Sequence, residues 1–145
     1  MSGAGATLNQ LNLAVRDMHA AVAFYRRLGV DLKTVGDGRH AAAQLANGML
    51  LELDTTDFVP EWDAGFAGST GGTTVLGFSL PSPEAVDEMY AELTGAGYRG
   101  HQPPYDAFWG ARYAIVDDPD GNPVGLMSPI VEELKYWPPR PPGTA

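Results

Sequence analysis

Hydrophobic and polar residues follow the same order in the two halves of the chain. Apolar residues alternate with smaller or polar ones over residues 11–15, and the alternation returns over residues 76–80. Each alternation predicts a half-buried strand, because successive side chains of a strand point to opposite faces. Apolar residues at helical spacing follow each of these strands, so each half is predicted to begin with a strand and a helix.

Both predicted helices carry start and end signals. Asp17 and Ser82 are the expected N-caps, and Pro83 takes the first helical position after Ser82. Gly29 and Gly95 are expected to end the two helices.

A hairpin completes each half. In the first half, strand-like segments at residues 40–46 and 49–54 flank Asn47-Gly48, a dipeptide typical of tight hairpins. In the second half, residues 111–117 and 122–128 flank a turn with Pro and Gly at 118–121. The pattern predicts an α+β fold of two tandem βαβββ modules, with extra residues of the second half in a loop around 101–110.

The modules are expected at residues 7–55 and 73–129, within one structural domain. Residues 56–72 form the linker, whose three aromatic residues predict that it packs over another part of the chain. Residues 130–145 form a proline-rich C-terminal tail, of which residues 136–145 are expected to be extended.

Composition and charge exclude several functions. With 9 Lys and Arg against 18 Asp and Glu, the 145-residue chain has a formal net charge of −9. Such a chain has no basic face for nucleic acid or for an anionic membrane. The absence of cysteine excludes disulfides and thiolate chemistry. No apolar stretch is long enough to span a bilayer and no secretory signal is visible, so a cytoplasmic protein is expected.

Strand parity places polar or small side chains opposite the face that the helices cover. Asn12, Glu52 and Ser79 belong to this second face, and Asp54 lies two residues beyond Glu52. Glu52 is a candidate general base, metal ligand or buried partner of a neighbouring group, or it faces solvent at a rim. If Asp54 also points inward, repulsion between the two carboxylates makes a base plausible.

Aromatic and basic residues cluster near residues 105–113. Phe108 and Trp109 offer stacking area for a flat ligand, or they pin the loop onto the core. Arg112 and His101 are candidate ligand contacts, as is Trp62 in the linker. Arg112 has a second interpretation as an ion-pair partner of Asp106 or Asp117. His19 is interpreted as a surface residue of the first helix, and His40 as a surface residue or a hydrogen-bonding residue at a strand edge.

Three segments together resemble the vicinal-oxygen-chelate superfamily of glyoxalase I, bleomycin-resistance proteins and extradiol dioxygenases. They are residues 11–17 with Ala23-Phe24-Tyr25, residues 50–53, and Asp117-Asp118-Pro119-Asp120-Gly121-Asn122. The resemblance is closest to the small bleomycin-resistance-like members. It implies two βαβββ modules forming an open, cup-shaped mixed barrel with the helices outside, usually within a homodimer.

The resemblance also implies where a metal would bind. Metal-using members place two ligands on each module, which correspond here to Gln10 and Glu52 in the first module and to Val75 and Gly125 in the second. Neither Val75 nor Gly125 can coordinate a metal. No cofactor is therefore expected; the alternative is one divalent Mn, Fe, Ni, Co or Zn ion at Gln10 and Glu52.

Two functions follow as hypotheses. The first is metal-independent binding or sequestration of a planar or amphipathic small molecule, and the acidic charge favours a cationic one. The second is a lyase, isomerase or dioxygenase that uses the metal or a metal-free base at Glu52. In both hypotheses the partners are a small molecule and a second copy of the chain, without nucleic acid or membrane.

Overall fold

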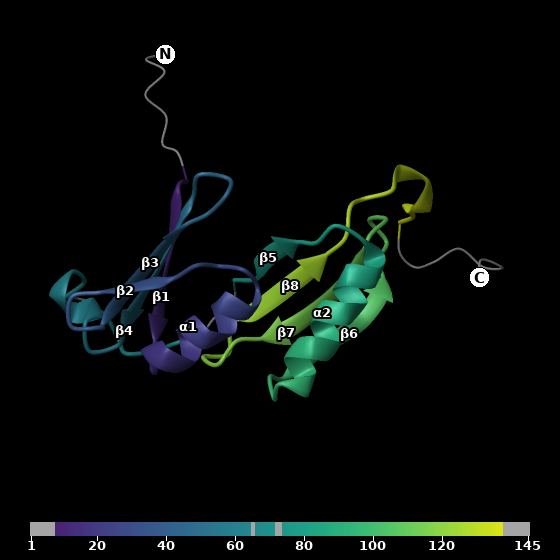
Figure 1. Cartoon of the computed structure of the whole chain (residues 1–145). Coiled ribbons are helices and arrows are strands. Elements are labelled where there is room, and N and C mark those ends of the chain that lie inside the picture. The colour runs from purple at the N-terminus through teal and green to yellow at the C-terminus, as the bar shows by residue number, and fades with distance from the viewer. Residues whose placement is uncertain (1–7, 65, 72–73, 138–145) are drawn as a thin grey trace, which may run out of the picture. The chain divides into compact units, whose positions relative to one another are not determined.

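Each half of the chain forms a four-stranded sheet with one helix (Figure 1). The computed structural model describes residues 8–64, 66–71 and 74–137. The halves separate into two units, residues 1–70 and 71–145. The prediction of an α+β fold with two tandem βαβββ modules is confirmed.

The first unit contains four strands, one α-helix and one short 3₁₀ helix. In chain order they are β1 (Gln10–Val15), α1 (Met18–Arg27), β2 (Lys33–Val35), β3 (His40–Gln44), β4 (Leu50–Thr55) and η1 (Val59–Glu61). The strand order is β1-β4-β3-β2. The β1–β4 pair is parallel and the other pairs are antiparallel, so the sheet is mixed and open.

The second unit repeats this topology. Its elements are β5 (Leu76–Ser79), α2 (Pro83–Gly95), β6 (Gly100–Asp106), β7 (Arg112–Asp117), β8 (Pro123–Met127) and η2 (Glu132–Leu134). The order β5-β8-β7-β6 corresponds to that of the first sheet, again with one parallel pair.

The predicted helix caps are confirmed. The Asp17 carboxylate accepts a hydrogen bond from the backbone N–H of Ala20, and the Ser82 hydroxyl accepts one from that of Ala85, both at 3.1 Å. These bonds satisfy backbone donors that a helix leaves open in its first turn. Gly29, just beyond α1, has φ +88°, a left-handed conformation that glycine adopts without strain.

Each helix covers one face of its own sheet: α1 packs on β3 and β4, and α2 packs on β6, β7 and β8. Apolar side chains fill the space between each helix and its sheet. In the first unit the fully buried ones include Val15, Phe24, Tyr25, Leu32 and Leu53; in the second they include Val86, Leu93, Val116, Val124 and Leu126. The opposite face of the first sheet carries polar residues that include Asn12, His40, Glu52 and Asp54.

One feature differs from the sequence-based expectation. Residues 100–106 form strand β6 rather than a loop, with irregular pairing to β7. Ahead of the segment expected to be extended, residues 132–134 form the short helix η2, and residues 138–145 of that segment lie outside the described part. No helix within residues 8–64, 66–71 and 74–137 has the length and apolar character needed to cross a bilayer.

Candidate functional site

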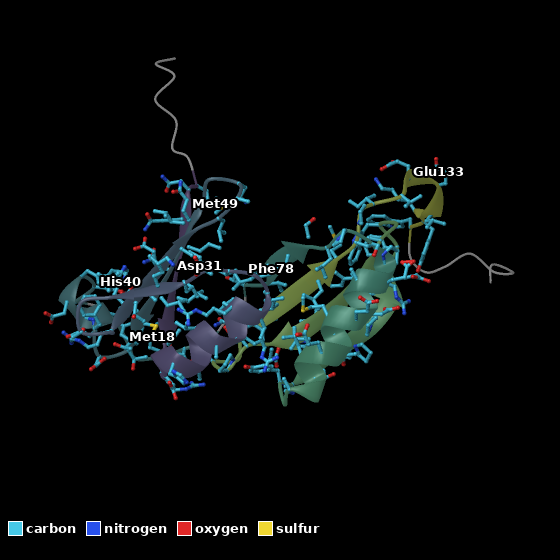
Figure 2. The ribbon with its side chains drawn as sticks, viewed as in Figure 1. Met18, Asp31, His40, Met49, Phe78 and Glu133 are labelled. Carbon is cyan, nitrogen blue, oxygen red and sulfur yellow. The ribbon has the colours of Figure 1, made fainter. Side chains whose placement is uncertain are left out.

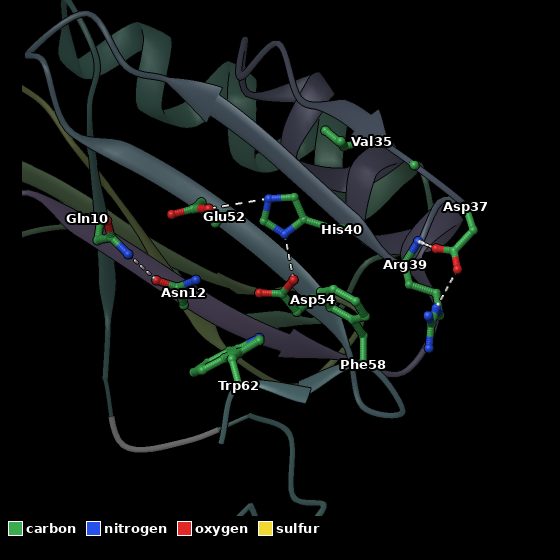
Figure 3. Close-up of a pocket in the computed structure, with 11 residues that line it drawn as sticks. Gln10, Asn12, Val35, Asp37, Arg39, His40, Glu52, Asp54, Phe58 and Trp62 are labelled. Carbon is green, nitrogen blue, oxygen red and sulfur yellow. Dashed lines mark hydrogen bonds and ion pairs between the residues drawn. The ribbon is translucent and has the colours of Figure 1, made fainter. Parts of the chain in front are cut away.

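The first unit has a hollow of about 630 Å³ on its polar sheet face (Figure 3). Its size is in the range typical of small-molecule sites, roughly 300–1,000 Å³. Strands β1, β3 and β4 contribute Gln10, Asn12, His40, Glu52 and Asp54 to it. The remaining lining residues come from the end of β2 and from the segments after β2 and β4; they are Val35, Gly36, Asp37, Arg39, Phe58 and Trp62.

A histidine between two carboxylates forms the polar centre of this hollow. His40 Nδ1 lies 2.6 Å from Asp54 Oδ1, and His40 Nε2 lies 3.3 Å from Glu52 Oε1 (Figure 3). The Asp54 side chain is 2% exposed, whereas those of Glu52 and His40 are 19% and 27% exposed. Asp54 is therefore a buried anchor for the imidazole, and Glu52 and His40 can reach a bound molecule.

The β3–β4 hairpin brings these three residues together. Its register places His40 opposite Asp54, and Glu52 lies two residues earlier on the same face of β4. The loop closes where Leu45 N–H donates to Met49 O at 2.7 Å, and Gly48 supplies a φ of +91°. The length of the hairpin loop thus sets the strand register that places Asp54 opposite His40.

Aromatic side chains form a second part of the hollow. Phe58 and Trp62 come from the segment around η1. The Arg39 guanidinium carbon lies 4.9 Å from the Phe58 ring centroid, so a cation already covers one face of Phe58. Trp62 is 55% exposed and keeps ring surface available.

Arg39 also pairs with an acidic neighbour. Its backbone N–H and Nε donate to the Asp37 carboxylate at 3.2 and 2.9 Å. These hydrogen bonds hold the pKa of Asp37 below its ordinary value. The charges of Arg39 and Asp37 thus compensate each other. The charge of the sheet face that lines the hollow therefore depends on Glu52 and Asp54.

The second unit has a different, mainly apolar pocket of about 450 Å³. It is lined by Val75, Gly77, Phe78, Ser79, Trp109, Tyr113 and Met127; Figure 2 shows the position of Phe78 in this unit. The Trp109 and Tyr113 rings meet edge to face at 5.0 Å, and Trp109 Nε1 lies 3.1 Å from the Met127 sulfur. Burial raises the pKa of the Tyr113 hydroxyl, and neighbouring Tyr105 adds to this effect.

The residues at the four implied metal positions do not fit a four-ligand site. Val75 has no donor atom, and Tyr113 covers Gly125: a Cβ at position 125 would lie 2.6 Å from the Tyr113 hydroxyl oxygen. In the first unit, Gln10 donates to Asn12 at 2.9 Å and Glu52 faces His40. Within the described residues, no three His, Cys, Asp or Glu side chains are grouped as metal ligands.

The other predicted site residues lie in two pockets, one in each unit. Gln10, Asn12, Glu52, Asp54 and Trp62 line the hollow of the first unit. Ser79 and Trp109 line the pocket of the second.

Three predicted ligand contacts have protein partners. His101 Nδ1 lies 2.7 Å from Asp117, and Phe108 packs against Trp109 and Trp137. Arg112 bridges Asp87 and Asp106, and these carboxylates raise its pKa. Its pairing with Asp106 was one of the two expected.

His40, Arg39 and Phe58 were not predicted to belong to the site. The signal for Phe58 was its position among the linker aromatics. His40 offered no signal without the hairpin register, because it lies 14 residues from Asp54 in sequence.

Comparisons with known proteins agree with this fold. The model of the Glyoxalase/Bleomycin resistance protein/Dioxygenase superfamily matches residues 7–126. A glyoxalase/bleomycin resistance protein/dioxygenase from Nocardioides is similar in structure, with 25% identity, a TM-score of 0.70, and coverage of 99% of this chain and 92% of that chain.

Two further solved structures show the same fold. A glyoxalase-related enzyme from Fulvimarina pelagi has 22% identity, a TM-score of 0.74, and coverage of 85% of this chain and 88% of that chain. A lactoylglutathione lyase from Agrobacterium tumefaciens has 19% identity, a TM-score of 0.64, and coverage of 86% and 95%. A comparison with curated proteins gave no match.

Proposed function

Because the chain belongs to the glyoxalase/bleomycin resistance protein/dioxygenase superfamily, we propose that it binds a small, planar, positively charged molecule in the hollow of its first unit. The observation that carries this proposal is the partly exposed Glu52 carboxylate beside His40, in a hollow that also exposes the Trp62 ring. The Glu52 carboxylate attracts a positive charge, and the Trp62 ring offers a flat surface for stacking.

The charge of the hollow favours a cation. Among the described lining residues, Asp37, Glu52 and Asp54 are acidic and Arg39 is basic. Because Arg39 is paired with Asp37, the two carboxylates beside His40 make the sheet face of the hollow negative. The net charge of −9 adds a long-range attraction for cations.

The aromatic wall favours a flat ligand. A planar cation can stack on Trp62 and gain both apolar contact and attraction to the ring face. Trp62 suits this role better than Phe58, because the Arg39 guanidinium lies over the Phe58 ring. We propose that this binding requires no metal ion, since Glu52 and Trp62 can contact the ligand directly.

Two dyes of the same shape test the proposal. N-methylacridinium is a permanent planar cation, and acridine is its neutral counterpart at mildly alkaline pH. The cation is expected to bind the protein about tenfold or more tightly than acridine, because a hydrogen bond or ion pair to a charged group contributes about 1.5–3 kcal/mol. Isothermal titration calorimetry measures both affinities.

Matched variants locate the effect. Glu52→Gln is expected to abolish the preference for the cation, whereas Glu61→Gln, which removes an exposed carboxylate of η1 outside the hollow lining, is expected to keep it. Equal affinity for the two dyes, or a preference that survives Glu52→Gln, would contradict the proposal.

A further inference from the structure

The wall of the hollow contains a planar cation that belongs to the chain itself. The Arg39 guanidinium carbon lies 4.9 Å from the centroid of the Phe58 ring, and Arg39 Nε donates to the Asp37 carboxylate at 2.9 Å (Figure 3). A guanidinium directs its N–H groups along its plane and leaves its two faces for stacking. Arg39 thus shows how a ring and a carboxylate of this hollow hold a planar cation together.

A second ring and a second carboxylate in the same hollow can contact a ligand. Trp62 is 55% exposed, the Glu52 side chain is 19% exposed, and both line the hollow. An ionised carboxylate has about four lone-pair sites for hydrogen bonds. Because the contact with His40 Nε2, at 3.3 Å, engages Glu52 Oε1, Glu52 retains acceptor capacity toward a bound molecule.

Amide carbonyls add further acceptors beside Glu52. The register of β1 and β4 places Asn12 opposite Glu52, and Gln10 lies two residues earlier on the same face of β1. Gln10 Nε2 donates to Asn12 Oδ1 at 2.9 Å, a bond that uses the amide nitrogen of Gln10 and leaves its carbonyl oxygen as an acceptor. This part of the hollow therefore favours a ligand that brings N–H donors.

We propose that the ligand is an aryl guanidinium or aryl amidinium, a planar cation whose N–H donors lie along one edge. This inference rests on the proposed binding function and names the ligand class of that site. The edge of the cation donates to Glu52, in the way that a guanidinium donates two parallel hydrogen bonds to a carboxylate. The flat body of the cation stacks on Trp62.

The same arrangement disfavours two other kinds of cation. A quaternary ammonium group has no N–H, so it offers the Glu52 carboxylate no hydrogen bond. A primary ammonium group has N–H donors, but it is compact, strongly hydrated and without a flat face for Trp62. The hollow is therefore expected to select charge and N–H donors that are combined in one planar group.

Three probes with the same phenyl ring separate these requirements. Phenylguanidinium carries a charge and N–H donors, N,N,N-trimethylanilinium carries the charge alone, and phenylurea carries N–H donors without a charge. Phenylguanidinium is expected to bind about tenfold or more tightly than each of the others, because it alone forms a hydrogen bond between two charged groups. Isothermal titration calorimetry at pH 7 measures the three affinities.

Two matched pairs of variants locate the bound probe. Glu52→Gln is expected to remove most of the preference for phenylguanidinium, whereas Glu61→Gln, exposed and outside the hollow lining, is expected to keep it. Trp62→Leu is expected to lower the affinity for phenylguanidinium about twofold to fivefold through the loss of stacking. Trp137→Leu, which removes an 82% exposed ring of the second unit, is expected to leave this affinity unchanged. Far-ultraviolet circular dichroism of each variant confirms that the compared proteins are folded.

Several results would overturn the proposal. Equal affinity for phenylguanidinium and N,N,N-trimethylanilinium, with phenylurea weaker, would reject the ligand class and leave the binding function standing. Binding of N-methylacridinium without binding of phenylguanidinium would have the same meaning. Equal affinity for phenylguanidinium and phenylurea, or binding of none of the cations, would reject the binding function as well. A preference for phenylguanidinium that survives in folded Glu52→Gln would reject the role of Glu52.

Discussion

Replacing Gly110 by alanine is expected to destabilise the second unit by about 2–5 kcal/mol. Gly110 has φ +87°, where an L-residue loses about 1–2 kcal/mol. A Cβ there would also lie 2.4 Å from the backbone oxygen of Val131, and overpacking costs about 1–3 kcal/mol. Because Gly110 follows Trp109, the substitution is expected to disturb the aromatic pocket of this unit too.

Gly121→Ala is the control for the Gly110 prediction. Gly121 has nearly the same φ, +86°, but a Cβ there would meet nothing within 4 Å. Its replacement is expected to cost only the conformational part, about 1–2 kcal/mol. Urea unfolding measures both variants, and an equal loss of stability would show that the contact with Val131 has no energetic effect.

Leu53→Ala is expected to destabilise the first unit by about 2–5 kcal/mol, as for other large-to-small core substitutions. Leu53 is 0% exposed and lies between Glu52 and Asp54 on β4, with its side chain on the opposite face. The core under β4 therefore holds the strand that carries both carboxylates. The expected result is a lower midpoint of urea unfolding.

Val35→Ala provides the comparison for Leu53. Val35 is 55% exposed, so little apolar area is lost on truncation and the free energy of unfolding is expected to change by less than about 0.5 kcal/mol. If Leu53→Ala were as mild as Val35→Ala, the two faces of β4 would have been assigned the wrong way round.

Local signals explain why the fold could be predicted. The strand alternation, the caps Asp17 and Ser82 and the glycines that end the helices depend on neighbouring residues alone. Strand β6 was missed because Pro103 and Pro104 argue against a strand. The structure accommodates them because β6 is an edge strand with shifts in its pairing to β7.

The candidate site depended on a register that the sequence left open. A two-residue turn at Asn47-Gly48 places His40 opposite Thr55, on the other face from Asp54. The observed loop is one residue wider, from Leu45 to Met49, and places His40 opposite Asp54. A shift of one residue thus decides whether His40 lies opposite Asp54, and the local sequence does not specify this register.

The lining of the second pocket could not be predicted from the sequence, because it depends on contacts between residues that are far apart along the chain. The lack of a donor at Gly125 was evident in the sequence, but the residue covering it was not. Tyr113 comes from the neighbouring strand β7, and its ring is held by Trp109 and Tyr105. Such contacts depend on the pairing of β7 with β8, which no local pattern specifies.

The most direct test of the central claim is to locate the bound ligand on the protein by NMR. Titration of ¹⁵N-labelled protein with N-methylacridinium is expected to shift the signals of Asn12, His40, Glu52 and the Trp62 indole, which all line the first hollow. Signals around Trp109 and Tyr113 are expected to change less. Shifts confined to the second pocket, or no shifts at all, would contradict the assignment of the ligand site to the first unit.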